Sequence, residues 1–196
     1  QQIKGVFAVD NPKQNYYQKD FLESLCFFIK TAMAREKEKK HLENLSYVDS
    51  LTYAQNRNHF NEYIEKNRRK ELYSVGVIYL DLNGLKEIND KMGHLAGDTL
   101  IISASYVLQE IFADNSYRIG GDEFVVIEQD VLESEFMSKY NKLLVRMKEL
   151  EISVATGYIW KERCLNLSEI LQAADQKMYE DKKRYYSIAQ KDRRRR

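Results

Sequence analysis

Two adjacent carboxylates, Asp122 and Glu123, directly follow two glycines in the segment RIGGDEFVVI (118–127). The flanking apolar residues are typical of strands, and a Gly-Gly pair accepts the positive φ angles of a tight turn, so the segment predicts a hairpin. Because unpaired charge is costly to bury, we expect a cation to neutralise the pair, and a divalent metal ion is the natural candidate. The alternative is an ordinary hairpin with an exposed acidic corner.

A third carboxylate, Asp81, stands at the end of the continuous apolar run 72–80. Such a run favours a strand buried on both faces, and sheets of this type present ligand groups at the carboxyl ends of their strands. If this end lies beside the hairpin, Asp81 and Asp122 can bracket a metal ion, and the main-chain carbonyl of Leu82 can add a third oxygen. Mg²⁺ prefers such a sparse set of oxygen ligands.

Polar residues after Asp81, in the segment DLNGLKEINDKMGHLAGD (81–98), have the chemistry to hold a purine. The carboxylate of Asp98 can accept from both N1–H and the exocyclic amine of guanine, and the amide of Asn89 can donate or accept along the purine edge. Each residue also has a structural alternative. Asp98 is also explained as a first-turn aspartate favoured by the helix dipole, and Asn89 as a helix-end cap.

Four motifs, in order along residues 49–186, resemble the GGDEF family of nucleotide cyclases, which make cyclic di-GMP. They are DSLTYAQNRNHF (49–60), the segment 81–98, the segment 118–127 and ADQKMYEDK (174–182). The resemblance implies a nucleotide-cyclase-like fold with a central, mostly antiparallel sheet flanked by helices. It also implies a reaction in which two GTP give cyclic di-GMP and two pyrophosphates. Because each nucleotide is both attacker and target, a homodimer of such domains is required.

The resemblance assigns a role to each candidate site residue. The residues that would hold Mg²⁺ or Mn²⁺ are Asp81, Leu82 through its main chain, Asp122 and Glu123. We expect Asp122, with Glu123 as its partner, to act also as catalytic proton acceptor. The substrate contacts would be Lys86 and Lys182 to phosphate, Asn89 and Asp98 to guanine, and His94, for which a local structural role is the alternative.

The chain departs from the family pattern at several positions. Leu85 stands where an aromatic residue is usual, and Tyr53 and Ala54 replace a glycine and a leucine. Tyr186 occupies the place of an arginine common four residues beyond Lys182. The departures at Leu85 and Tyr186 support an alternative function, a catalytically weak domain that acts as a GTP-binding regulatory or dimerisation module. A pure interaction module and a cyclase with an adenine-containing product are further alternatives.

Composition narrows the class of protein. The 31 basic and 30 acidic residues nearly cancel, so net charge gives no case for attraction to nucleic acid or to a membrane surface. No apolar run approaches the roughly 18 residues of a membrane span. The two cysteines lie far apart and suggest neither a disulfide framework nor a cysteine metal site. A reduced, cytoplasmic setting is expected.

Four regions are expected along the chain. Residues 1–19 resemble the end of a GAF sensor domain upstream, and residues 20–48 predict a connecting helix. Residues 49–187 predict the GGDEF domain, and residues 188–196 a basic tail. Within 49–187 we expect helices at 57–70, 84–112 with a break near Gly93, 133–150 and 168–186, and strands at 72–80, 117–128 and 152–160. This alternation predicts an α/β, more narrowly an α+β, sandwich with one central sheet.

The connecting helix carries an apolar stripe, with Leu22, Leu25, Ile29 and Ala32 at steps of three and four residues. This pattern is typical of a helix that pairs with a copy of itself and so passes a signal from the sensor to the dimer. Packing of the helix on its own domain is the alternative.

Overall fold

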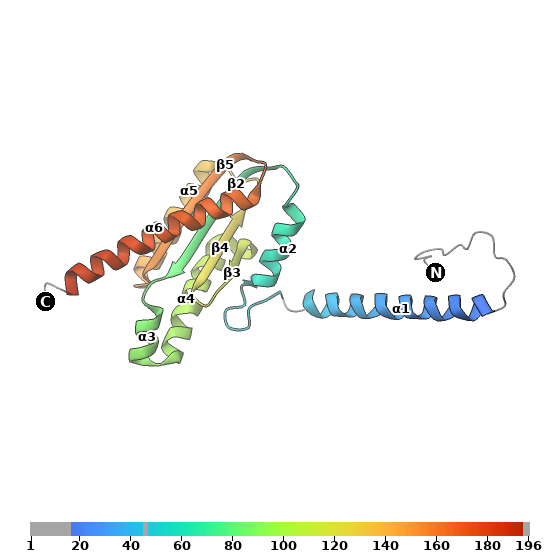
Figure 1. Cartoon of the computed structure of the whole chain (residues 1–196). Helices are drawn as coiled ribbons and strands as arrows, with labels where there is room; N and C mark the ends of the chain where they lie inside the picture. Colours follow the sequence, from blue (N-terminus) through green and yellow to red (C-terminus); the bar gives the residue numbers. More distant parts are fainter. Residues whose placement is uncertain (1–16, 45–46, 194–196) are drawn as a thin grey trace. The chain divides into compact units, whose positions relative to one another are not determined.

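The structure, a computed structural model, describes residues 17–44 and 47–193 (Figure 1). The chain separates into two compact units, of which the first ends at Asn44 and the second begins at Leu45. The described part of the first unit is the helix α1 (Tyr17–Asn44). The predicted sensor remnant at 1–19 lies outside the described residues, apart from the start of α1. No helix in the described ranges combines the length and hydropathy needed to cross a membrane.

The second unit is built on one five-stranded sheet with the order β1-β3-β4-β2-β5. The strands are β1 (Gln55–Asn56), β2 (Leu72–Leu82), β3 (Ser116–Arg118), β4 (Glu123–Glu128) and β5 (Val154–Cys164). β1 and β3 run parallel, whereas the pairs β3–β4, β4–β2 and β2–β5 are antiparallel. The structure thus confirms the predicted sandwich with a mostly antiparallel sheet.

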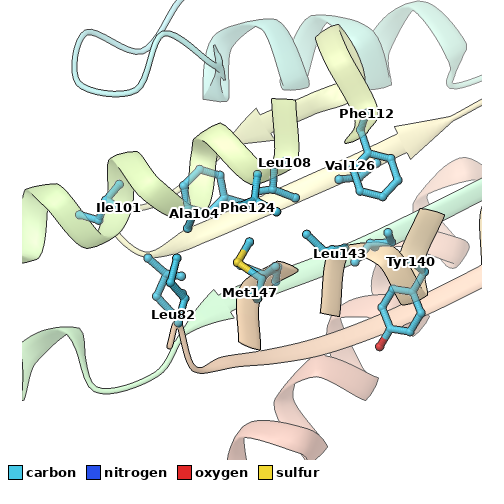
Figure 2. Close-up of a cluster of buried hydrophobic side chains, with 14 of the residues drawn as sticks. Leu82, Ile101, Ala104, Leu108, Phe112, Phe124, Val126, Tyr140, Leu143 and Met147 are labelled. Carbon is cyan, nitrogen blue, oxygen red and sulfur yellow. The ribbon is translucent and has the colours of Figure 1, made fainter. Parts of the chain in front are cut away.

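Two layers of helix cover the sheet (Figure 1). The helices are α2 (Arg57–Asn67), α3 (Leu85–Met92), α4 (His94–Phe112), α5 (Glu133–Glu149) and α6 (Leu167–Arg193), with a 3₁₀ turn at Ala113–Asn115. One core cluster joins α4 and α5 to the sheet, and the other joins α2 and α6 to its opposite face. Figure 2 shows the first cluster, to which α4 contributes Leu108, β4 contributes Phe124 and α5 contributes Met147.

The packing of β2 explains why its sequence is continuously apolar. Ile78 and Leu80 point into the α4–α5 cluster, while Val75 and Val77 point into the α2–α6 cluster. All four side chains are fully buried. The predicted strand buried on both faces is therefore confirmed, and it holds Asp81 at a fixed position near its carboxyl end.

Several element boundaries differ from the sequence prediction, among them the end of β5, which lies at Cys164 instead of Trp160. α1 ends at Asn44, and Tyr47 and Val48, predicted as helix, join the second unit, because Asn56 N donates to Tyr47 O at 2.8 Å and Val48 pairs with Gln55. α2 ends at Asn67, earlier than expected. α6 continues into the predicted basic tail as far as Arg193.

The turn between β3 and β4 is wider than predicted. Neither Gly120 nor Gly121 has a positive φ, so the expected tight Gly-Gly turn is wrong. Instead Ile119 N and Gly120 N both donate to Glu123 O, which closes a four-residue loop. Gly120 lies close to Glu123, since a Cβ at position 120 would be 2.5 Å from Glu123 Oε2 and would make that side chain shift.

One departure from the family pattern carries a conformational cost. Tyr53, where a glycine is usual, has a φ of 58° and is 78% exposed. A side chain in the left-handed region costs about 1–2 kcal/mol, so we expect Tyr53→Gly to stabilise the fold by about 1 kcal/mol. Urea unfolding measures the change. Tyr106→Gly, at an exposed position of α4, is the matched control and should destabilise. Destabilisation by both variants would contradict this account.

Candidate active site

The carboxylate of Asp81 is buried and only partly compensated. The residue is 1% exposed, and its Oδ2 accepts a hydrogen bond from Lys182 Nζ at 2.5 Å. Its Oδ1 is also buried and has no hydrogen-bond partner in the part of the chain that the structure describes. A buried carboxylate with one oxygen unpaired retains a demand for positive charge.

Close packing of α6 on β5 brings Lys182 to Asp81. Gly157 of β5 allows the approach, since a Cβ there would lie 2.1 Å from Ala174 O and 2.3 Å from Met178 N. Both atoms belong to the backbone of α6, so a side chain at position 157 would push the helix away. Lys182 lies one turn beyond Met178 and reaches back to the end of β2.

Two further carboxylates lie beside Asp81. Asp81 is paired with Glu123 in the β2–β4 register, and Leu82 N donates to Asp122 O at 3.0 Å. Burial raises the pKa of Asp81, Lys182 opposes this rise, and the negative charges of Asp122 and Glu123 add to it. Burial lowers the pKa of Lys182, but its bond to Asp81 outweighs this effect and the net shift is upward. The single ammonium group of Lys182 therefore does not balance the charge of the three carboxylates, and a divalent cation would supply the missing positive charge.

Arg118 links the loop that carries Asp122 to Asp49. Its Nη2 donates to Gly121 O at 2.8 Å, and its Nη1 donates to Asp49 Oδ1 at 2.8 Å. Asp49 is further fixed by hydrogen bonds from the main chain and hydroxyl of Thr52. This chain of contacts fixes the residue before Asp122 and so restricts where its carboxylate can lie.

The Lys182–Asp81 pair gives a stability prediction. Lys182→Met leaves the buried Asp81 carboxylate without a cation and should lower the free energy of unfolding at pH 7.5 by about 2 kcal/mol. The raised pKa of Asp81 means that the folded state holds its proton to higher pH than the unfolded state. Ionisation of Asp81 therefore lowers the free energy of unfolding as the pH rises. Between pH 4 and pH 7.5 this free energy should fall more in Lys182→Met than in the wild type.

Urea unfolding without metal or nucleotide measures this effect. Lys183→Met, at the next, exposed position of α6, is the matched control and should change stability by a few tenths of a kcal/mol at most. Asp81→Asn in the Lys182→Met background should recover most of the loss, because no buried charge then remains. A loss of equal size at both pH values would contradict the assignment.

The predicted guanine contacts lie on α3 and α4, just beyond the end of β2 (Figure 1). Asp98 is the fifth residue of α4, and the first turn contains no acidic residue, so stabilisation by the helix dipole does not explain it. Asn89 accepts the capping N–H of Gly93 through its main-chain oxygen, not its side chain. Both structural alternatives from the sequence are therefore wrong.

Two predicted substrate contacts are exposed. Lys86 is the second residue of α3, and His94 is the first residue of α4. Gly84, with a φ of 75°, turns the chain from β2 into α3 and so places the start of α3 four residues after Asp81. Lys86 stands in the first turn of that helix, where an anion is favoured. The roles of both residues stay predictions.

The donor set near Asp81 fits a hard divalent cation. The unpaired Oδ1 of Asp81 and the neighbouring Asp122 are the oxygen ligands that Mg²⁺ prefers, and the main-chain oxygen of Leu82 is the predicted third. No three acidic, histidine or cysteine side chains converge as a metal cluster within residues 17–44 and 47–193. Glu123 lies against Gly120, so its role as a metal ligand stays a prediction.

Sequence reasoning missed two residues that shape the site. Arg118 lies two residues before the Gly-Gly pair, and its contact with Asp49 joins two motifs that the sequence could only place in order. Gly97 lies against the side chain of Asn89, since a Cβ there would be 2.0 Å from Asn89 Oδ1. A glycine inside a helix was the available signal for Gly97.

Comparison with known proteins agrees with this architecture. The family model described as diguanylate cyclase, GGDEF domain, matches residues 46–186. The signaling protein YkoW of Bacillus subtilis (strain 168) is 33% identical over 190 residues, which cover 86% of this chain and 24% of YkoW. The probable diguanylate cyclase DgcI of Escherichia coli (strain K12) is 27% identical over 184 residues, 92% of this chain and 40% of DgcI. The chain thus spans well under half the length of either relative.

A solved structure shows the same fold. The coiled coil and GGDEF domain of DgcB from Caulobacter crescentus, in complex with c-di-GMP, matches with a TM-score of 0.62 and 20% identity. The match covers 81% of this chain and 93% of that one. Because the family model spans the sheet, its flanking helices and the loop before Asp122, the chain belongs to the GGDEF domain family, whose namesakes are diguanylate cyclases.

Proposed function

We propose that this chain is a diguanylate cyclase, which condenses two GTP into cyclic di-GMP and two pyrophosphates across a dimer of its GGDEF domains. The observation that carries the proposal is the buried carboxylate of Asp81, under-compensated by Lys182 and placed beside Asp122. A site built only for stability would not retain an unpaired buried carboxylate oxygen next to two more acids.

Each residue of the site has a task in this proposal. Asn89 and Asp98 orient the guanine, so that the triphosphate extends past the start of α3 toward Asp81. Lys86 and Lys182 neutralise phosphate charge, and Asp122, with Glu123 beside it, accepts the proton of the attacking 3′ hydroxyl. Asp81, Asp122 and Leu82 O would hold Mg²⁺ or Mn²⁺, which would supply charge stabilisation for the phosphate oxygens.

Phosphate binding requires Lys182 to exchange partners. In the structure its ammonium group is paired with Asp81. A divalent ion that takes over this charge frees Lys182 for the triphosphate, so metal and nucleotide should bind cooperatively. Lys182 is about one-third exposed and therefore has room to move.

The chemistry requires two domains. The product is two-fold symmetric, so two GTP-loaded sites must face each other about a two-fold axis. α1 exposes Phe21, Leu25 and Phe28, which are spaced for pairing with a second copy of the helix. We propose that α1 sets the dimer geometry in response to a sensor domain upstream, in the cytoplasm where GTP is available.

A second candidate function has one specific observation in its favour. Tyr186 occupies the usual arginine position, and the nearby Arg184 forms an ion pair with Asp181 at 3.6 Å. If no arginine replaces the usual phosphate contact, the domain binds GTP but turns it over weakly, and acts as a regulatory or dimerisation module.

Incubation with GTP and Mg²⁺, followed by chromatographic identification of the product, tests the proposal. Cyclic di-GMP supports the cyclase. GTP binding without product supports the regulatory module, and the absence of GTP binding leaves a pure interaction module. A product with adenine from a GTP and ATP mixture would overturn the assignment of Asp98 as a guanine-specific contact.

A further inference from the structure

The helices α3 and α4 pack closely at Gly97. A Cβ at this position would lie 2.0 Å from Asn89 Oδ1, 2.9 Å from Asn89 Cγ and 3.1 Å from Leu85 Cδ1. The Asn89 amide therefore fills the space that any other residue at position 97 would occupy. Asn89 Oδ1 is buried there and finds no hydrogen-bond partner among the described residues.

The backbone does not explain this glycine. Gly97 lies inside α4 without a positive φ, so every residue type could adopt its conformation. Within a helix, glycine is about 1 kcal/mol less favourable than alanine. The helix thus carries a destabilising residue at the one place where the Asn89 side chain needs room.

The position of Gly97 links the two predicted guanine contacts. Leu85 and Asn89 are four residues apart on α3, so they share one side of that helix, and both point at Gly97. Gly97 is followed directly by Asp98. The absent side chain therefore lets the Asn89 amide lie against the residue that precedes Asp98, and Leu85 packs against the same point.

We propose that Gly97 is a positioning residue for guanine recognition: it seats the Asn89 amide beside Asp98, so that the pair binds guanine nucleotides in preference to adenine nucleotides. This inference rests on the proposed function. A carboxylate and an amide together match the donors and acceptor on the guanine edge, whereas adenine lacks the N1–H and the 2-amine. Displacement of the amide by about one methyl group would break that match.

Gly97→Ala tests the proposal. The added methyl group must push the amide out of its seat, so we expect affinity for a non-hydrolysable GTP analogue to fall about tenfold or more, with a smaller change for the matching ATP analogue. Calorimetric titration of the whole chain measures both. Thr99→Ala, on the exposed side of the same helix, is the control and should leave both affinities unchanged.

A double-mutant cycle separates positioning from packing. Asn89→Ala removes the atoms that an alanine at position 97 would strike, so the Asn89→Ala, Gly97→Ala double variant should bind the GTP analogue as Asn89→Ala alone does. Thermal unfolding supplies a readout without nucleotide. Gly97→Ala should lower Tm in the wild-type background and leave it unchanged, or raise it, in the Asn89→Ala background.

Three results would overturn the inference. Wild-type GTP affinity in Gly97→Ala would show that the amide needs no such seat. Equal losses of affinity in both backgrounds would show that Gly97 serves helix packing alone. Failure of the wild-type chain to bind the GTP analogue would overturn the proposed function and this inference with it, whereas the first two results leave the proposed function standing.

Discussion

Asp81→Asn and Asp122→Asn should each lower the rate of cyclic di-GMP formation about 10³-fold. Each change removes one carboxylate from the place where a divalent cation would stabilise phosphate charge, a contribution of about 4 kcal/mol to the barrier. Initial rates with GTP and Mg²⁺ measure the effect. Asp130→Asn, at the opposite end of β4, is the matched control and should retain the wild-type rate.

The two variants should differ in stability, which separates a lost ligand from a damaged fold. Asp81 is buried with a raised pKa, so its ionised form opposes folding at neutral pH. Asp81→Asn should therefore match or exceed the wild type in thermal unfolding while losing turnover. Asp122 is only half-buried, and Asp122→Asn should be near neutral for stability. Wild-type turnover in either variant contradicts the metal assignment.

Replacement of Leu25 and Ile29 by glutamate should lower turnover about tenfold or more without weakening GTP binding by the isolated domain. Both residues belong to the predicted stripe of α1, and Leu25 is 37% exposed. If α1 pairs with a second copy of itself through this stripe, the two glutamates on one helix repel those on the other and separate the dimer. Turnover should then depend steeply on protein concentration, because two domains must meet for each product.

The control for α1 places the same charges on its other side. Lys30→Glu with Ala34→Glu changes two exposed positions of α1 outside the predicted stripe. We expect near wild-type turnover from this pair. Sedimentation analysis should show a dimer for the wild type and the control, and a monomer for the variant with glutamate at Leu25 and Ile29. Equal turnover in the two double variants argues against pairing through Leu25 and Ile29.

The parts of the fold that were predictable are those that depend on local pattern. The apolar run of β2 favoured a strand with both faces covered, and the structure covers both. Helices were also predicted over 84–112, 133–150 and 168–186. In the structure α4, α5 and α6 end within a few residues of these limits or run beyond them. The two-residue strand β1 has no such pattern, because it depends on parallel pairing with β3 far along the chain.

The sequence supplied candidate residues for the site but not the geometry that relates them. The resemblance named Asp81 and Lys182, yet nothing in the sequence shows that they form an ion pair with each other, since they are about a hundred residues apart. The turn before Asp122 misled the prediction. Gly120 lies close to Glu123 and does not have a positive φ. The sequence alone cannot distinguish these two reasons for a glycine.

The central claim is that Asp81 and Asp122 together hold a divalent cation against the triphosphate of GTP. Electron paramagnetic resonance of Mn²⁺, titrated into the protein with a non-hydrolysable GTP analogue, tests it most directly. We expect a bound Mn²⁺ signal with the wild type and with Asp130→Asn, and its loss with Asp81→Asn and with Asp122→Asn. Equal Mn²⁺ binding by all four proteins would contradict the claim.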